Sequence, residues 1–368
     1  MLTELRLRRA AQPATERWRH VPVPPRGAVP LGISYRPLQA EALGLEPRAA
    51  LTALLRYPFE LIRVAAYWNR LEPRPGVFEF GEFDRVLDAA ERAGKRVIVG
   101  LGPVKNFGYP EFFVPGHHLN RPLPEGSLVT PRTHPRLLAA GTGFATRLVR
   151  RYRDREAIIA WQVEHEAADP LGVEHSWRLS EAFIRAEVAA VRDADPGRPV
   201  LMNGFLPTST PVALQQRWRT RDQGDSLAVA LRLADIVGAD VYPRHAVAAA
   251  GPLSLYLDGG ATRRGRRRRE HLLGQVAAAG RRIMIAEGQA EPWEAVTTPP
   301  NPAGRVMSSC RPEDLIGNYR AIMDWAGESR GVMNGYLFWG AEYWLARERD
   351  GDPGYLRAFE RVLAGGTA

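Results

Sequence analysis

The chain has 368 residues, of which 45% are hydrophobic and 25% are charged, so it can form one large core. Its only cysteine, Cys310, excludes an internal disulfide framework, and no apolar run reaches the roughly 18 residues of a membrane span. Residues 1–27 are basic and lack the apolar centre of a secretory signal. We therefore expect a soluble lead-in, a cytoplasmic location and no membrane partner.

The net charge of +9 comes from 50 Lys and Arg against 41 Asp and Glu, and nearly all of the cations are arginine. The densest patch, residues 263–269, lacks interleaved aromatics and runs directly into Glu270 and apolar residues. This pattern is typical of a solvated helix start, so we expect no nucleic-acid partner.

Apolar runs alternate with helical periodicity along the rest of the chain. In one helical segment, Phe83, Val86, Leu87 and Ala90 share a face of a helix that stops at Gly94. The eight predicted strands are residues 31–35, 61–67, 97–101, 158–163, 199–203, 236–241, 283–286 and 335–339. Repeated strand-then-helix units indicate a parallel sheet, and eight of them predict a (β/α)8 TIM barrel, α/β in class, over residues 28–368 as a single catalytic domain.

Other folds and cofactors leave recognisable marks that this chain lacks. A doubly wound sheet normally carries a Gly-rich turn after an early strand, and residues 36–41 contain no glycine. His165 and Glu166 do not form a metalloprotease motif because Asp169 stands where the second histidine is required. We expect neither a metal nor an organic cofactor.

Two predicted strands each lead into a glutamate, at Glu166 and at Glu287. Two carboxylates on separate strands can act on opposite sides of one bond, which is how glycosides are hydrolysed. Glu164 shares the strand parity of Glu166 and is the alternative acid. Glu291 is the corresponding alternative to Glu287.

A family resemblance lies in four motifs that follow one another in the right order. Residues 62–80 with 83–94, residues 161–166 (Trp-Gln-Val-Glu-His-Glu), residues 285–287 and residues 338–340 resemble motifs of the second, fourth, seventh and eighth strands of clan A glycoside hydrolases. The chain is most similar to the family 42 β-galactosidases and the family 5 cellulase-like enzymes. The resemblance implies a retaining β-glycosidase with a carbohydrate substrate.

The resemblance also implies a role for each candidate residue. Glu166 is the expected general acid and base, and Glu287 the expected nucleophile. The expected substrate-binding residues, which surround the sugar or support the nucleophile, are Arg63, His165, Tyr242, Trp339, Trp68 and Trp344. Arg63 would support the nucleophile, Tyr242 would hydrogen-bond it, and Trp339 would underlie the sugar. Each of these residues has a structural alternative, as a buried ion pair or as a packed aromatic.

His165 stands where the clan usually has an asparagine that contacts the sugar 2-hydroxyl. Imidazole offers a different set of hydrogen bonds and titrates near neutrality, so we expect altered sugar recognition. Two alternatives to a hydrolase stay open: a carbohydrate-binding barrel without catalysis, and a transglycosidase. Neither the sugar nor the oligomeric state follows from these residues.

Overall fold

The computed structural model describes residues 5–9, 16–108, 111–124, 126–169, 177–219, 224–250, 253–259, 262–292, 309–328 and 333–365. Eight strands form a closed barrel in the order β12-β13-β2-β3-β4-β6-β8-β9. Their bounds are β2 Leu31–Tyr35, β3 Leu61–Ala65, β4 Arg96–Gly100, β6 Ile158–Gln162, β8 Val200–Phe205, β9 Ile236–Val241, β12 Arg282–Gln289 and β13 Met333–Trp339. The predicted TIM barrel is therefore confirmed.

All eight predicted strands exist, and β2 and β9 have the predicted bounds. The largest difference is at β12, which runs on to Gln289 where the prediction ends at residue 286. Its register shifts between Ile285 and Gly288, so this end of the strand is irregular. Hydrophobic periodicity does not report such an extension because residues 287–289 are polar or glycine.

Helices follow most of the strands. They are α1 Pro37–Ala42, α2 Pro47–Leu55, α3 Trp68–Leu71, α4 Gly81–Arg92, α5 Pro135–Tyr152, α6 Glu181–Ala194, α7 Thr210–Arg219, α8 Ser226–Leu233, α9 Arg263–Ala278, α10 Pro312–Glu328, α11 Ala341–Arg349 and α12 Gly354–Ala364, with 3-10 helices η2 Glu16–His20 and η3 Gly116–His118. Their starts obey simple rules. Ser180 caps α6 by accepting a hydrogen bond from the Phe183 amide, and Pro135 opens α5.

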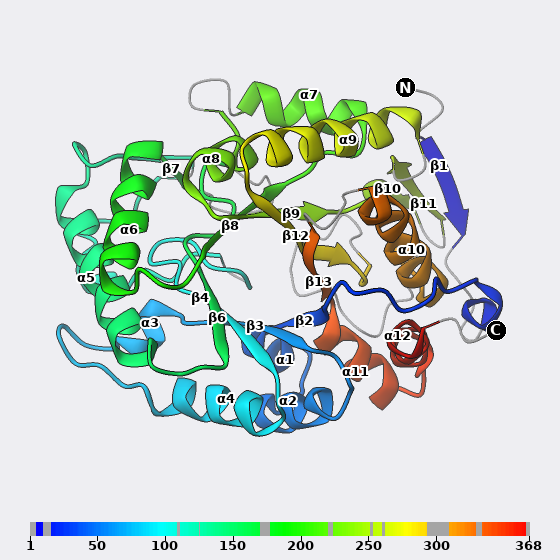
Figure 1. Ribbon diagram of the computed structural model, residues 1–368, viewed down its shortest axis with the longest axis horizontal. Coiled ribbons are helices and arrows are strands. Elements are labelled where there is room, and N and C mark those ends of the chain that lie inside the picture. The colour runs from blue at the N-terminus through cyan, green and yellow to red at the C-terminus, as the bar shows by residue number, and fades with distance from the viewer. Residues whose placement is uncertain are drawn as a thin grey trace. The chain divides into compact units, whose positions relative to one another are not determined.

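The chain divides into two compact units. Unit 1 comprises Met1–Glu60, Leu206–Gln215 and Asp240–Ala368, and unit 2 comprises Leu61–Phe205 and Gln216–Ala239. In unit 2, β3 pairs in parallel with β4, and β4 with β6. Helices α5 and α6 lie side by side there (Figure 1). Helix α4 buries Phe83, Leu87 and Ala90 of the predicted face, and Val86 is half-buried.

In unit 1, β13 pairs in parallel with β12 and with β2. The ring of Phe359 on α12 packs 5.2 Å from that of Phe338 and 4.8 Å from that of Trp344. This unit also contains a small antiparallel sheet that the sequence analysis missed, in the order β1-β11-β10. Its strands are β1 Leu5–Arg9, β10 Arg244–Ala250 and β11 Leu253–Asp258. The lead-in thus contributes a strand, and its boundary at residue 27 stays a prediction.

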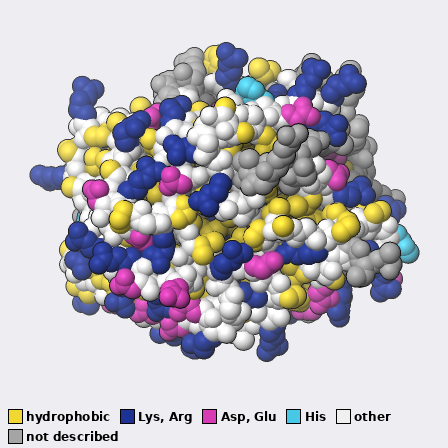
Figure 2. Space-filling model, viewed as in Figure 1, with side chains coloured by type: hydrophobic (Ala, Val, Ile, Leu, Met, Phe, Trp, Pro, Cys, Tyr) yellow, Lys and Arg dark blue, Asp and Glu magenta, His cyan; other side chains and the backbone are white. Residues whose placement is uncertain are grey.

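A third, two-stranded sheet pairs β5 (Leu128–Val129) with β7 (Arg178–Leu179) in unit 2. Among the described helices, none is both long and apolar enough to cross a membrane. Lys and Arg side chains are spread over the face in Figure 2, with Asp and Glu side chains among them.

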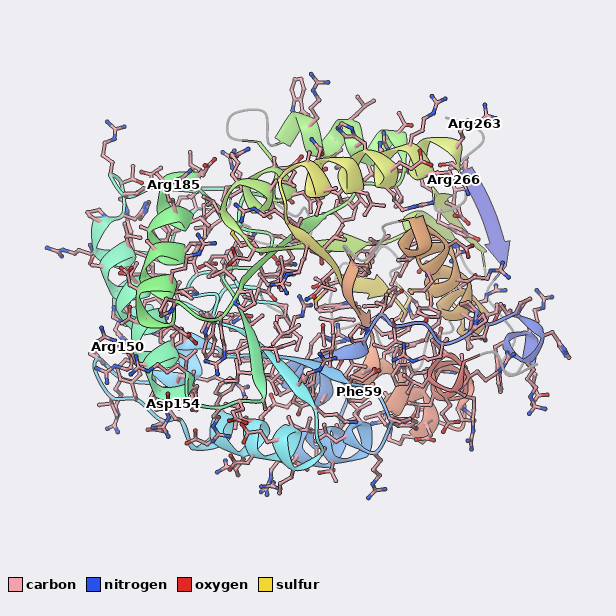
Figure 3. The ribbon with its side chains drawn as sticks, viewed as in Figure 1. Phe59, Arg150, Asp154, Arg185, Arg263 and Arg266 are labelled. Atoms are coloured by element: carbon pink, nitrogen blue, oxygen red, sulfur yellow. The ribbon has the colours of Figure 1, made fainter. Side chains whose placement is uncertain are left out.

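The arginine-rich patch forms the first turns of α9, as the sequence predicts. Arg263 and Arg266, labelled in Figure 3, are exposed. Arg268 instead donates a 2.8 Å hydrogen bond to the carbonyl of Ser209, and Arg269 is buried. Part of the patch therefore serves the packing of α9 within unit 1.

Candidate active site

The end of β6 carries two glutamates in an unusual backbone conformation. The strand stops at Gln162, and the φ angles of Glu164 and Glu166 are 57° and 43°. Positive φ is uncommon for residues other than glycine and often occurs at functional sites. Because the backbone is no longer that of a regular strand, equal parity does not make these two side chains point the same way.

Glu164 is held by the loop that follows β4. It is buried, and its two carboxylate oxygens accept hydrogen bonds from the amides of Val104 (3.0 Å) and Lys105 (2.5 Å). The buried carboxyl group of Glu187, on α6, interacts with it directly. Burial raises the pKa of Glu164, and burial together with the charge of Glu164 raises the pKa of Glu187 well above its usual range. Glu164 therefore anchors a loop.

Glu166 is 3% exposed and is positioned through its backbone. The ammonium of Lys105, itself buried, donates hydrogen bonds to the carbonyls of Glu166 (2.8 Å) and Asp169 (3.0 Å). The Glu166 carboxylate lies near Glu111 and His165, with one polar atom of each residue within 4.8 Å of the others. The acid candidate is thus surrounded by polar side chains of its own unit.

His165 is neutral and has a defined tautomer. Asn203 contacts the His165 ring at Nδ1 over 2.9 Å, while the Asn203 carbonyl oxygen accepts a 2.9 Å hydrogen bond from Gln162. The Asn203 amide nitrogen is therefore the donor to Nδ1, and the proton of the ring is on Nε2. Burial, followed by the charges of Arg63 and Lys105, holds the pKa of His165 well below its usual value. The expectation that it titrates near neutrality was wrong.

Arg63 lies in the middle of β3 and is completely buried. Its guanidinium donates a 3.3 Å hydrogen bond to Gln162 and stacks 4.1 Å from the centre of the Phe107 ring. A continuous polar chain therefore runs from Arg63 through Gln162 and Asn203 to His165.

Glu287 lies near the end of β12 in unit 1 and is 3% exposed. The hydroxyl of Tyr242, the first residue after β9, donates a 2.6 Å hydrogen bond to its carboxylate. The contact that the resemblance implies between these two residues is present. A charged acceptor makes such a bond strong, and the bond also fixes the direction of the carboxylate.

Glu291, the alternative to Glu287, is engaged in a buried ion pair. Its two oxygens accept hydrogen bonds of 2.9 and 3.0 Å from the guanidinium of Arg36, the residue after β2. Arg36 donates a further 2.9 Å bond to Glu342 on α11. With both oxygens occupied in this way, Glu291 has a structural role.

The three candidate tryptophans differ in their surroundings. Trp339, at the end of β13, is 6% exposed, and the Arg36 guanidinium lies 4.2 Å from the centre of its ring. Trp68 is fully buried between the rings of His118 and Phe144, at 4.6 and 5.2 Å. Trp344 is also fully buried, and its indole N–H donates to the Ala290 carbonyl.

The packing of Trp68 and Trp344 fits their structural alternatives, and a contact of either ring with sugar stays a prediction. Trp339 remains the candidate for the floor under the sugar, with one ring face covered by Arg36.

Comparison with known proteins gives a family match over part of the chain. The sequence model of glycoside hydrolase family 42, described as β-galactosidase, matches residues 53–221, which include β3, β4, β6 and β8. The match covers less than half of the chain and makes this segment similar to a clan A glycoside hydrolase family. No curated protein matches the chain.

Solved structures with a similar fold also include clan A enzymes. Xylanase 10B from Thermotoga maritima is 13% identical with a TM-score of 0.56, over 91% of this chain and 94% of that one. GH5_18 from Streptomyces cattleya, solved with GlcNAc, is 15% identical with a TM-score of 0.55, over 94% and 82%. The exo-β-1,4-mannosidase Op5Man5 from Opitutaceae bacterium strain TAV5 is 18% identical with a TM-score of 0.54, and the match covers 89% of this chain and 55% of the mannosidase.

Four polar residues that hold candidate residues in place were not predicted from the sequence. Gln162, Asn203 and Lys105 do so in unit 2, and Arg36 does so in unit 1. Asn203 ends the predicted fifth strand and Arg36 follows the first, so both stand where barrel enzymes carry functional side chains. Lys105 is one of only two lysines in the chain. A search for polar residues at every strand end would have found Asn203 and Arg36.

Proposed function

We propose that the chain is a retaining β-glycoside hydrolase in which Glu287 is the nucleophile and Glu166 the general acid and base. The observation that carries the proposal is the Tyr242 hydrogen bond to Glu287, which holds a buried carboxylate in one orientation near the end of a barrel strand. Glu166 follows β6, and the carboxyl ends of barrel strands are where barrel enzymes carry out their chemistry.

The reaction would proceed in two displacements. In the first, Glu287 attacks the anomeric carbon while protonated Glu166 donates its proton to the leaving oxygen, and a glycosyl ester forms as the glycosidic bond breaks. In the second, Glu166 removes a proton from water, which attacks the same carbon and releases Glu287. Both inversions together retain the β-configuration.

His165 would act as a hydrogen-bond donor to the 2-hydroxyl of the sugar. Its Nε2 carries the proton because Nδ1 is occupied by the Asn203 amide. Asparagine at this position would offer both a donor and an acceptor, whereas this imidazole offers only the donor. The charge of Arg63 would favour the ionised form of the nucleophile, and Trp339 would pack against the sugar ring.

A panel of nitrophenyl β-glycosides tests the proposal directly. The family description puts galactosides first, and the names of the similar structures add xylosides and mannosides. We expect release of nitrophenol, with the β-anomer as the first product in the NMR spectrum. Glu287→Ala should abolish turnover, and azide should restore it with formation of the α-glycosyl azide.

A matched control compares Glu287 with Glu291, the other glutamate near the end of β12. Glu291→Gln should retain turnover if the protein folds, because Glu291 belongs to the Arg36 ion pair. An α-anomer as the first product, or no azide rescue, would exclude the retaining roles. Sugar binding without release of nitrophenol from any substrate would favour the carbohydrate-binding alternative, and products that join two sugars would indicate a transglycosidase.

A further inference from the structure

Glu72, His117 and His118 form a compact cluster outside the proposed catalytic residues. Glu72 follows α3, within the motif that resembles the second strand and helix of clan A enzymes, and the two histidines end η3. The Nε2 atom of His118 lies 3.0 Å from one Glu72 oxygen, and the Nε2 atom of His117 lies 3.5 Å from the other. One ligand atom from each residue lies within 4.8 Å of the others.

These separations fit a tetrahedral metal ion. Zinc binds histidine nitrogen and carboxylate oxygen at about 2.0 to 2.2 Å, so neighbouring ligand atoms of a tetrahedron lie about 3.3 Å apart. Two histidines and one glutamate are a common zinc ligand set with a fourth position left for water. The side chains of His117 and His118 are 21% and 24% exposed, so an ion can reach the site from solvent.

The ligands are oriented by their neighbours, as metal ligands usually are. The Trp68 indole N–H donates a 2.7 Å hydrogen bond to one Glu72 oxygen, and the Gly76 amide donates a 2.9 Å bond to the other. The ring of His118 stacks on Trp68. Although burial acts to raise the pKa of Glu72, the hydrogen bonds that it accepts lower the pKa overall, so the carboxylate is ionised.

We propose that Glu72, His117 and His118 bind one zinc ion, which clamps η3 to the segment after β3. The two segments already touch, because the Asn69 amide donates to the Phe113 carbonyl. The ion takes no part in the glycosidase chemistry proposed above and has a structural role. The proposal stands on unit 2 alone and is independent of the proposed function.

Zinc titration of the whole, chelator-stripped protein tests the site. We expect calorimetry to show one zinc ion per chain at micromolar concentration or below, and the melting temperature to rise with zinc concentration. His117→Ala and His118→Ala should each weaken binding at least about tenfold. His271→Ala, which removes an exposed histidine on α9, should bind zinc as the wild type does.

Two further measurements keep the test decisive if a variant folds poorly. Cobalt(II) added to the wild-type protein should give the intense visible bands of a tetrahedral ion, and added zinc should abolish these bands by displacing the cobalt. Glu72→Gln retains an acceptor for Trp68 and should weaken binding without unfolding. Absence of binding at micromolar zinc, octahedral cobalt spectra, or unchanged affinity in both histidine variants would overturn the proposal.

Discussion

The hydroxyl of Tyr242 and the carboxylate of Glu287 are joined by a 2.6 Å hydrogen bond, and both groups are buried. The two residues are far apart in the chain, one after β9 and the other near the end of β12. Because a buried carboxylate needs a donor, this bond both offsets the cost of burial and holds the Glu287 carboxylate in one orientation.

Tyr242→Phe should lower kcat/KM by roughly tenfold to a hundredfold, since hydrogen bonds to charged groups contribute about 1.5 to 3 kcal/mol. The ring is retained, so the melting temperature should change little. Steady-state kinetics on an active nitrophenyl glycoside would measure the loss. Unchanged kinetics would mean that Tyr242 does not assist the nucleophile.

Glu166→Ala should affect substrates according to their leaving groups. Dinitrophenolate departs without a proton, so dinitrophenyl glycosides should still form the glycosyl ester, while alkyl glycosides should lose nearly all activity. Glu164→Gln supplies the comparison. It should impair both substrates alike, because Glu164 holds the amides of Val104 and Lys105. The reverse pattern would make Glu164 the acid.

His165→Ala should lower kcat and kcat/KM together, by roughly tenfold to a hundredfold, if His165 donates to the 2-hydroxyl in the transition state. A 2-deoxy substrate should be slow with the wild type and show little further loss with the variant. Additive losses would mean that His165 does not contact this hydroxyl. Because His165 is buried and neutral, the pH–rate profile should not contain its titration near neutrality.

The pair of Glu164 and Glu187 should make stability depend on pH. Both pKa values are raised by burial, so folding retains protons that the unfolded chain releases above about pH 4.5. The contribution of this pair to the free energy of unfolding should therefore be greatest below that pH. It should fall as the pH rises, by up to about 1.4 kcal/mol per pH unit for each group.

Glu187→Gln removes one of the two titrating groups and should flatten the decline in unfolding free energy between pH 5 and pH 8. Urea denaturation at several pH values would measure it. Glu181→Gln, on the same helix, is the control. The pKa of Glu181 is lowered, chiefly by its hydrogen bond from Arg232, so this change should leave the slope in that range intact. A slope unaffected by Glu187→Gln would show that Glu187 does not contribute to this pH dependence.

Much of the fold follows from periodicity that the sequence displays openly. Strands buried on both faces are continuous apolar runs, and this is why β2 and β9 could be predicted with their observed bounds. The end of β12 was missed because it is polar, and β1 and β11 were missed because they mix apolar with polar residues. β10 contains the apolar residues 246–250, which were not predicted as a strand. Hydrophobic periodicity in the sequence indicates which residues are buried, and it did not identify these segments as strands.

The distinction between similar side chains depended on tertiary contacts. Glu164 and Glu166 share a strand parity, but positive φ angles and the amides of the loop after β4 separate their roles. Glu291 has a structural role because it forms an ion pair with Arg36, which lies 255 positions away in the chain. The sequence also did not show that Trp68 packs against His118 and Phe144, or that Trp344 donates to the Ala290 carbonyl.

The sequence by itself determined the eight-stranded barrel, the order of its motifs and the candidates Glu166 and Glu287, because apolar spacing and strand-end position are properties of the chain. Tyr242 became a candidate through the resemblance to clan A enzymes. Only the tertiary structure decided that Glu164 holds a loop, that Glu291 pairs with Arg36 and that His165 is a neutral donor. Charge state, tautomer and hydrogen-bond partner depend on groups that folding brings together from distant positions, and no local pattern encodes them.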